Sequence, residues 1–245
     1  WLTPEQQKIY SRGNFGLGFG WGLDTEINFN STTSLRTGLN FSTFNAGINY
    51  YDADLNLSRR TFYVLDASEN FVNWDDGLLT DSTKNIYQLY NRKFSVNYVN
   101  IPLILKLKTN EIGYFTYYGE FGPTIGLKTK STVDDDSKLF TWNSNDSTFI
   151  ESLPYTTKLE KINIDNGTQT VRLGLTLGAG AEYSLSGSTA LFVQLNWNYF
   201  INNLLSSEEK EKFLRKEDEN SKGVFNSVGA KSFPGNIVLS FGILF

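Results

Sequence analysis

Five charged residues stand out in the sequence because each lies on the polar side of a segment that alternates between apolar and polar residues: Arg36, Lys106, Glu120, Arg172 and Glu182. Two carboxylates beside cations could act as an acid–base pair or transfer protons. The chain contains no His and no Cys, which excludes hydrolytic mechanisms that use a histidine base and any thiolate metal site. Whether these charges do chemistry or only pair with one another depends on what encloses them.

Three other features of the sequence bear on which ligands the protein could bind. Asp134-Asp135-Asp136 could bind Ca²⁺, but acidic runs in loops are usually solvated, so no metal is predicted. The glycines of Gly13–Leu23 mimic a phosphate-binding loop, yet their spacing is Gly-x-Gly-x-Gly-x-Gly and no strand precedes them. The net charge of −4 and the absence of a basic stripe argue against a nucleic-acid partner. No cofactor is expected.

The alternating segments predict β-strands with one uniformly apolar face. In the last ten residues, Asn236–Phe245, every second residue from Ile237 onwards is large and apolar. Six further segments behave alike, and most are about twice the usual strand length. They are Gly13–Leu23, Leu35–Tyr51, Phe94–Lys108, Tyr114–Lys128, Val171–Leu185 and Thr189–Asn202.

Short and long connections alternate between these segments, as they do in membrane barrels. We therefore predict an all-β, antiparallel, up-and-down transmembrane β-barrel that forms a single domain over residues 1–245. Its extended external loops are expected at 52–93, 129–169 and 206–233. A soluble β-sandwich is the alternative. It explains less well why long strands carry apolar faces, and why one such strand ends at Phe245.

The direction of the chain suggests an orientation and a strand count. If Phe245 lies at the periplasmic rim, all three long loops are external and the tight connections periplasmic. Seven strands are then visible, whereas bacterial barrels have an even number. We therefore expect eight strands, the first of them upstream of residue 1. The interior of such a small barrel is filled by its own side chains, so the five charges are expected to form an ion-pair plug.

Several local predictions follow from the same patterns. The phase of alternation slips between Phe41 and Phe44, which predicts a β-bulge. Asn166-Gly167 predicts a hairpin turn, and Ser206 to Lys216 a short helix. Large aromatic residues on the apolar faces are expected to face lipid or form interface girdles. These aromatics are Phe15, Phe19, Trp21, Tyr117, Phe121, Tyr183, Trp197, Tyr199, Phe241 and Phe245.

Three stretches resemble the PorT-type (porin-like) outer-membrane β-barrel proteins of the Bacteroidota: 100–106 (NIPLILK), 118–123 (YGEFGP) and 175–183 (LTLGAGAEY), together with the terminal Phe245. Asn100 departs from the family pattern, which often has Glu before the Ile-Pro pair. The resemblance implies eight strands and, for PorT itself, a part in type IX secretion. Asp81-Ser82-Thr83 and Asp146-Ser147-Thr148 also resemble the O-glycosylation acceptor of this bacterial group, at Ser82 and Ser147.

Taken together, these patterns predict a non-enzymatic protein of the outer membrane. We expect an accessory or structural subunit of a larger envelope complex, with protein secretion as the favoured setting. A barrel whose loops bind a surface ligand or assist nutrient uptake is one alternative, and a narrow channel is another. The expected partners are outer-membrane lipid or lipopolysaccharide and other envelope proteins.

Overall fold

A computed structural model describes residues 11–50, 60–74, 84–143, 145–146, 148–205, 214–218, 224–227, 233 and 235–245. These residues form one antiparallel sheet of thirteen strands. A short 3-10 turn, η3 (Asp165–Gly167), interrupts the strands. Within the described residues, no helix is long and apolar enough to cross a membrane.

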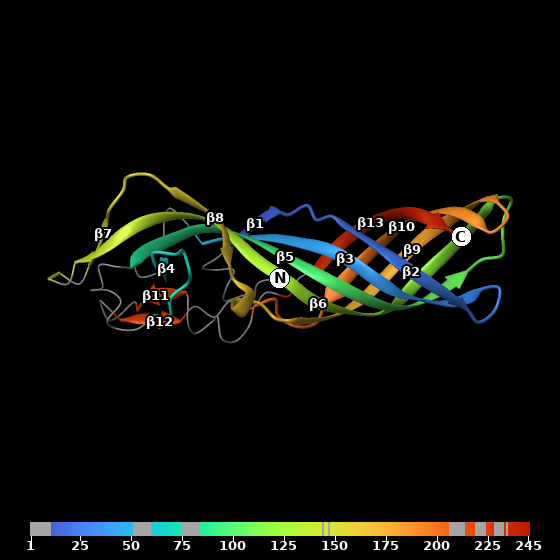
Figure 1. Cartoon of the computed structure of the whole chain (residues 1–245), viewed down its shortest axis with the longest axis horizontal. Coiled ribbons are helices and arrows are strands. Elements are labelled where there is room, and N and C mark those ends of the chain that lie inside the picture. The colour runs from blue at the N-terminus through green and yellow to red at the C-terminus, as the bar shows by residue number, and fades with distance from the viewer. Residues whose placement is uncertain are drawn as a thin grey trace.

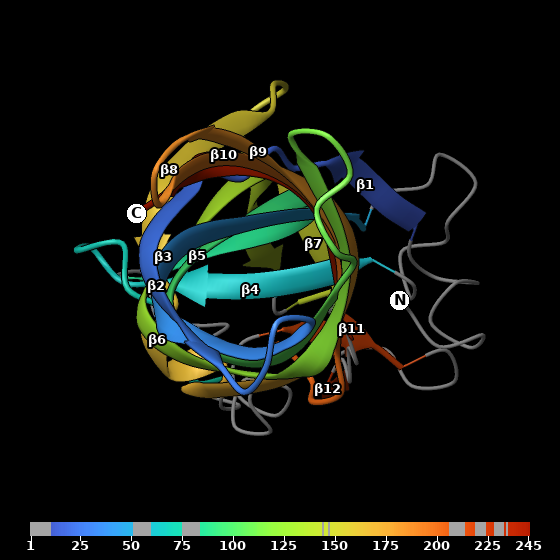
Figure 2. The ribbon, with the colours of Figure 1, turned by 90° about the vertical axis from the view of Figure 1, so that its right-hand side faces the viewer.

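Seven long strands make the barrel wall, and each is antiparallel to the next along the chain (Figure 2). Their alternating residues separate an exposed apolar face from an interior face, because neighbouring side chains of a strand point to opposite sides. The strands are β2 (Gly20–Asn28), β3 (Thr33–Asn49), β5 (Asn85–Lys108), β6 (Phe115–Asn143), β9 (Val171–Ser186), β10 (Thr189–Phe200) and β13 (Gly235–Leu244).

The barrel wall is not closed among the described residues. β2 pairs only with β3, and β13 pairs only with β10, so both have one unpartnered edge. The predicted strand Gly13–Leu23 is divided into β1 (Ser11–Phe15) and β2, because residues 16–19 between them are not in strand conformation. The register of β1 with β3 also shifts between Arg12 and Phe15. The seven predicted wall strands are therefore present, whereas the predicted eighth is not seen in the described part of the chain.

One end of the barrel carries only tight connections, and we call it the turn end. There, Gly113 and Gly187 reverse the chain with positive φ angles of 69° and 59°, a conformation that glycine adopts without steric cost. The C-terminus also lies at this end (Figure 1). The connection between β2 and β3 spans only residues 29–32, so the interval 24–34, expected as a connection, is mostly strand.

The opposite end continues into a packed extension, well separated from the turn end in Figure 1. β5 and β6 run 24 and 29 residues and pair far beyond the barrel. The shorter strands of the extension add to them: β4 (Thr61–Leu65), β7 (Thr148–Glu151), β8 (Thr157–Asn163), β11 (Arg215–Glu217) and β12 (Phe225–Ser227). The intervals expected as loops at 52–93, 129–169 and 206–233 thus contain much strand.

The bulge predicted between Phe41 and Phe44 is wrong. The register of β3 with β5 runs without a shift, and Phe44 points inward. The phase of alternation changes because the interior itself turns from polar to apolar at this level. Two register shifts of the long strands lie between β5 and β6, where Tyr90 and Thr129 are extra residues. They fall where the wall passes into the extension, which fits the bending effect of a bulge.

Two other local predictions are corrected. Asn166 and Gly167 do not form a hairpin turn, because they lie in η3, and Gly167 is buried without a positive φ. The flanking strands β8 and β9 both pair with β6 rather than with each other. The predicted helix ends in strand β11, while its first part, 206–213, lies outside the described residues.

A hydrophobic cluster fills the interior where barrel and extension meet. β4 crosses this end of the barrel (Figure 2), and its Tyr63 and Leu65 pack into the cluster. Burying such residues is the main stabilising contribution to this part of the fold. The cluster consists of Phe44, Ile48, Tyr50, Tyr63, Leu65, Leu89, Phe94, Val96, Tyr98, Val133, Leu159, Ile162, Ile164, Leu204, Leu205 and Leu214.

A second cluster covers the other face of the extension sheet. Phe62 lies at its centre, stacked on Phe149 with ring centroids 4.1 Å apart. β4 therefore contributes alternate residues to both clusters, and all five of its residues are buried. The second cluster contains Phe62, Val64, Ile86, Phe140 and Phe149, with Val72, Trp74, Trp142 and Phe225 partly buried against them.

Lys161 offers a test of backbone strain in the extension. It has a φ of 58° within β8, and its N–H donates to Asp134 Oδ1 at 2.8 Å. A lysine in this conformation is strained, so Lys161→Gly is expected to stabilise the extension by about 0.5–1 kcal/mol in urea unfolding. Lys158→Gly, without a positive φ in the same strand, should instead destabilise it. Equal effects of both substitutions would contradict the assignment of strain to Lys161.

Candidate functional site

Charged side chains meet inside the barrel near the turn end. Lys106 Nζ contacts Glu26 Oε2 at 2.9 Å and also pairs with Glu182. Arg36 bridges Asp24 Oδ2 at 2.5 Å and Glu120 Oε1 at 2.8 Å. Lys108 is the second cation on Glu26. We call these seven residues the interior charge cluster: Asp24, Glu26, Arg36, Lys106, Lys108, Glu120 and Glu182.

The strand registers explain why these side chains meet. Glu26 is directly opposite Arg36 across β2 and β3, and Lys106 is opposite Glu120 across β5 and β6. All seven residues have even numbers, and the even-numbered residues of these strand segments face the barrel interior. Four of the five residues singled out in the sequence come together here. Asp24, Glu26 and Lys108 were missed, although the even-numbered face of their strands could have indicated them.

Arg172, the fifth residue, does not join the charge cluster. It lies nearer the hydrophobic cluster, where its guanidinium is held between the rings of Tyr98 and Phe200, each centroid 3.8 Å from Cζ. Its Nη2 donates to Asn100 Oδ1 at 3.1 Å. The prediction that Arg172 belongs with Glu120 and Glu182 is therefore corrected, because strand stagger places it at another level.

Neutral hydrogen bonds connect other interior positions. Thr124, Thr176 and Asn198 form a continuous chain, with oxygen–oxygen distances of 3.0 and 2.7 Å, and Asn198 donates onward to Asn236 at 2.9 Å. Elsewhere Tyr118 donates to Gln194 at 3.1 Å, and Lys106 Nζ lies 4.1 Å from the Tyr118 ring centroid. These contacts occupy the barrel interior with its own side chains, as expected for a small barrel.

In the extension, Arg92 forms a bidentate ion pair with Asp135, with distances of 2.8 and 2.7 Å, and both side chains are fully buried. Tyr63 lies beside this pair and hydrogen-bonds Ser137 at 2.9 Å. Burial, followed by the negative charge of Asp135, raises the pKa of Tyr63 well above its ordinary value, so its hydroxyl stays neutral.

In the acidic run 134–136, the carboxylate of Asp135 pairs with Arg92, and that of Asp134 accepts a hydrogen bond from the backbone N–H of Lys161. Asp136 lies opposite Lys158 of β8. Within the part of the chain that the structure describes, no group of three or more potential metal ligands is found.

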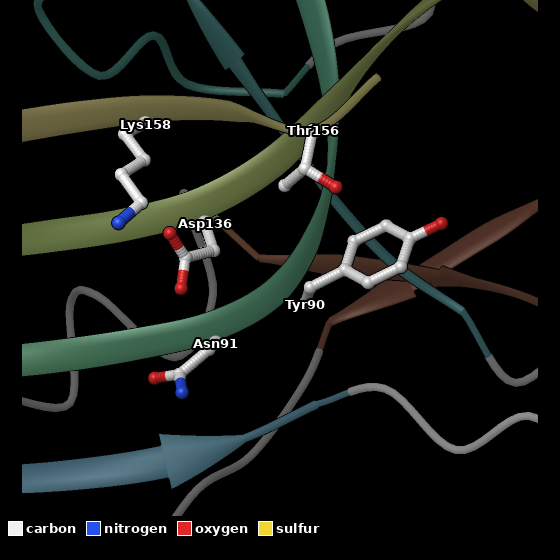
Figure 3. A pocket seen from close by; sticks show the side chains of 5 residues that line it. All are labelled: Tyr90, Asn91, Asp136, Thr156 and Lys158. Atoms are coloured by element: carbon white, nitrogen blue, oxygen red, sulfur yellow. The ribbon is translucent and has the colours of Figure 1, made fainter. Parts of the chain in front are cut away.

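A hollow of about 360 Å³ opens on the outer side of the extension (Figure 3). Tyr90, the extra residue of the β5 bulge, forms one side of it. Asp136 and Lys158 lie toward the other side in Figure 3. Asn91 and Thr156 complete the lining, so an aromatic ring stands near amide, hydroxyl and charged groups. An aromatic surface with a few polar groups is a common composition for a small-molecule site.

Nine of the ten predicted girdle aromatics have exposed rings on the outer face. They range from Tyr199, 37% exposed, to Phe245, 96% exposed. The side chain of Phe15 lies outside the described residues, as do Ser82 and Ser147, the two predicted O-glycosylation positions. Together with exposed aliphatic residues, these aromatics give β6, β9, β10 and β13 an apolar outer face.

Chemically, each carboxylate of the interior charge cluster pairs with a cation, although the cluster holds four carboxylates and three cations and keeps one net negative charge. Glu26 accepts from Lys106, Lys108 and the Ser34 hydroxyl, and Asp24 accepts from Arg36 and the Asn40 amide. Such compensation is typical of buried structural ion pairs, in which each charge is stabilised by a partner.

The chain matches, over residues 2–206, a family described as "Outer membrane protein beta-barrel domain". The protein belongs to this family. The match covers most of the chain, including β1 to β10, and agrees with the exposed apolar wall and the antiparallel sheet. As a family member, it is a β-barrel protein of the outer membrane. Searches of curated proteins and of solved structures found no match to the chain.

Proposed function

We propose that this outer-membrane barrel is a non-enzymatic accessory or structural subunit of a larger envelope complex, and that its extension binds the partner proteins. The observation that carries the proposal is the contrast between its two ends. The barrel interior holds the ion-paired charge cluster, followed by a hydrophobic cluster. The extension continues the barrel sheet and has apolar clusters on both faces, which makes it a firm platform for recognition.

The proposed orientation places the C-terminus at the periplasmic side and the extension outside the cell. The tight turns at one end and the long excursions at the other support it, since outer-membrane barrels have short periplasmic turns. The exposed apolar wall then meets outer-membrane lipid, including lipopolysaccharide, and its aromatic residues form the interface girdles.

We further propose that the barrel has eight strands in the membrane. The seven wall strands alternate in direction, so β2 and β13 run the same way. One additional strand between them would be antiparallel to both and would satisfy both edges, which cannot remain unpaired in lipid. An eighth strand contributed by this chain agrees with the PorT-type resemblance.

Type IX secretion is the setting that the resemblance favours. The motifs that carry it lie on wall strands: 100–106 on β5, 118–123 on β6 and 175–183 on β9. These motifs support a barrel architecture shared with the PorT-type proteins. The role in secretion is proposed by analogy with that architecture.

The test is co-purification after extraction in a mild detergent. Partners in stoichiometric amounts should accompany the protein, and they should be lost when Ile150 and Tyr155 are replaced by Ser. These residues are exposed apolar positions of the extension, at 53% and 60%. Ile112→Ser is the matched control, because Ile112 is 63% exposed at the turn end. Isolation of the wild-type protein as a lone monomer would contradict the subunit role.

The hollow beside Tyr90 favours one second candidate, a barrel that binds a surface ligand or assists nutrient uptake. Its lining offers an aromatic surface and hydrogen-bonding groups (Figure 3), and it belongs to the extension, which we propose lies outside the cell. Tyr90→Ala would then abolish ligand capture by intact cells and leave co-purification unchanged. The reverse pattern would assign the extension to protein partners instead.

A further inference from the structure

Arg172 is a buried cation with no carboxylate beside it in the described part of the chain. It is 4% exposed, and among the described residues its side chain makes one hydrogen bond, from Nη2 to Asn100. Its Nε and Nη1 atoms are buried and meet no acceptor among those residues. A guanidinium remains charged at any physiological pH, so these donors cannot be neutralised by loss of a proton.

The other interior arginines show what is different here. Arg36 contacts two carboxylates, and Arg92 forms a bidentate pair with Asp135. The four carboxylates of the interior charge cluster are each engaged by a cation of that cluster. Burying a charge without a counter-charge is strongly unfavourable.

The aromatic contacts compensate for only part of this cost. Tyr98 and Phe200 cover the two faces of the guanidinium, where cation–π attraction acts. The N–H groups, however, point outward in the guanidinium plane, and only an acceptor approaching within that plane can satisfy them. A negatively charged acceptor supplies both the hydrogen bond and the missing charge.

Asn100 holds its oxygen in position for such a site. Its amide nitrogen donates to the backbone oxygen of Asn40 at 3.1 Å and to Ser42 Oγ at 2.8 Å, which leaves Oδ1 facing Arg172. The neutral amide therefore anchors one edge of the guanidinium without neutralising it. The donors on Nε and Nη1 make no hydrogen bond to a described residue.

We propose that Arg172 anchors an anion-binding site inside the barrel, which takes a halide or a single carboxylate group. Either ligand uses the same chemistry, a compact negative acceptor in the plane of the guanidinium between Tyr98 and Phe200. The site does not depend on the subunit role proposed above.

Bromide is the probe, since it mimics chloride and scatters anomalously. Unfolding of the detergent-solubilised full chain would be followed in sodium bromide and in sodium methanesulfonate of equal ionic strength, because methanesulfonate carries no carboxylate and is much larger than a halide. Bromide at about ten times its Kd should lower the unfolding constant on the order of tenfold. Arg172→Met should abolish this dependence, whereas Arg36→Lys, which retains the charge beside its carboxylates, should preserve it.

Asn100→Asp provides a second variant that retains Arg172. It places a carboxylate where Asn100 Oδ1 now lies 3.1 Å from Nη2, so the bromide dependence should fall toward that of Arg172→Met. Crystals grown in bromide should show an anomalous peak within hydrogen-bond distance of Nε or Nη1. That measurement remains decisive if Arg172→Met does not fold.

A bromide peak beside Nε or Nη1, together with bromide-dependent stability, supports the proposal. Water alone beside Nε and Nη1, together with equal unfolding in the two salts, would overturn the proposal.

Discussion

Replacing Asp135 by Asn is expected to destabilise the extension by about 3–5 kcal/mol, because the fully buried guanidinium of Arg92 then loses the carboxylate that pairs with two of its nitrogens. Both side chains of this pair are 0% exposed, and Tyr63 and Phe71 enclose the guanidinium, at 5.3 and 4.9 Å from Cζ to the ring centroids. Solvent therefore cannot replace the lost carboxylate. The expected result is local unfolding of the extension, seen as rapid proteolysis within it while the barrel stays protected.

Asp136→Asn is the matched control for this prediction. Asp136 is the next residue of β6, points to the outer side and is partly exposed, so its loss should change stability by less than about 0.5 kcal/mol. Replacing both members of the buried pair, Arg92→Met with Asp135→Leu, should restore much of the lost stability, because no charge is then left unpaired. Similar proteolysis of the Asp135 and Asp136 variants would show that the ion pair does not hold the extension together.

The wall strands could be predicted from the sequence because a strand with one face toward lipid and one toward the barrel interior alternates between apolar and polar or small residues. Each residue of one face is apolar, and the opposite face carries small or polar side chains, as Val171–Ser186 illustrates. This pattern also indicated the even-numbered positions that point inward. Family membership and the strand register both agree with that part of the prediction.

The extension could not be predicted in the same way because protein covers both of its faces. In β4 all five residues are buried, so no alternation of polarity marks the strand. β5 begins at Asn85 rather than Phe94, and β6 continues to Asn143 rather than Lys128, through polar residues such as the acidic run. Polar residues that pair across strands look like loop residues when the partner strand is unknown.

The sequence indicated which charged residues face the interior, but it did not show which of them pair with one another. Which inward side chains meet across a barrel depends on the stagger between strands, and sequence alone does not give that stagger. Arg172 was therefore assigned to the wrong level, while Lys106 and Glu182, on strands that are not neighbours, do meet. Asp24 and Glu26 were missed because acidic residues after a glycine-rich strand were interpreted as a turn.

Lys106→Met is expected to have the largest effect on the barrel itself. Lys106 is 3% exposed and pairs with Glu182 and Glu26. Glu26 keeps Lys108 after the substitution, whereas Glu182 loses the one cation that pairs with it among the described residues. Leaving that carboxylate uncompensated should destabilise the barrel by about 3–5 kcal/mol in urea unfolding.

Adding Glu182→Gln to Lys106→Met should recover most of this loss, since an amide carries no charge to compensate. Lys138→Met provides the contrast, because its ion pair with Glu151 is partly exposed and contributes less than about 1 kcal/mol. If the double variant were as unstable as Lys106→Met, the loss would arise from packing rather than from the charge of Glu182.

The same variant separates a closed barrel from a narrow channel. If the interior charges were the sole barrier to ions, Lys106→Met would conduct in planar bilayers well above the wild type. The hydrophobic cluster between the barrel and the extension is a second barrier, with Phe94, Val96 and Val133 each at most 1% exposed. We therefore expect wild type and variant alike to stay at background conductance, and a conducting wild type would favour the channel over the subunit role.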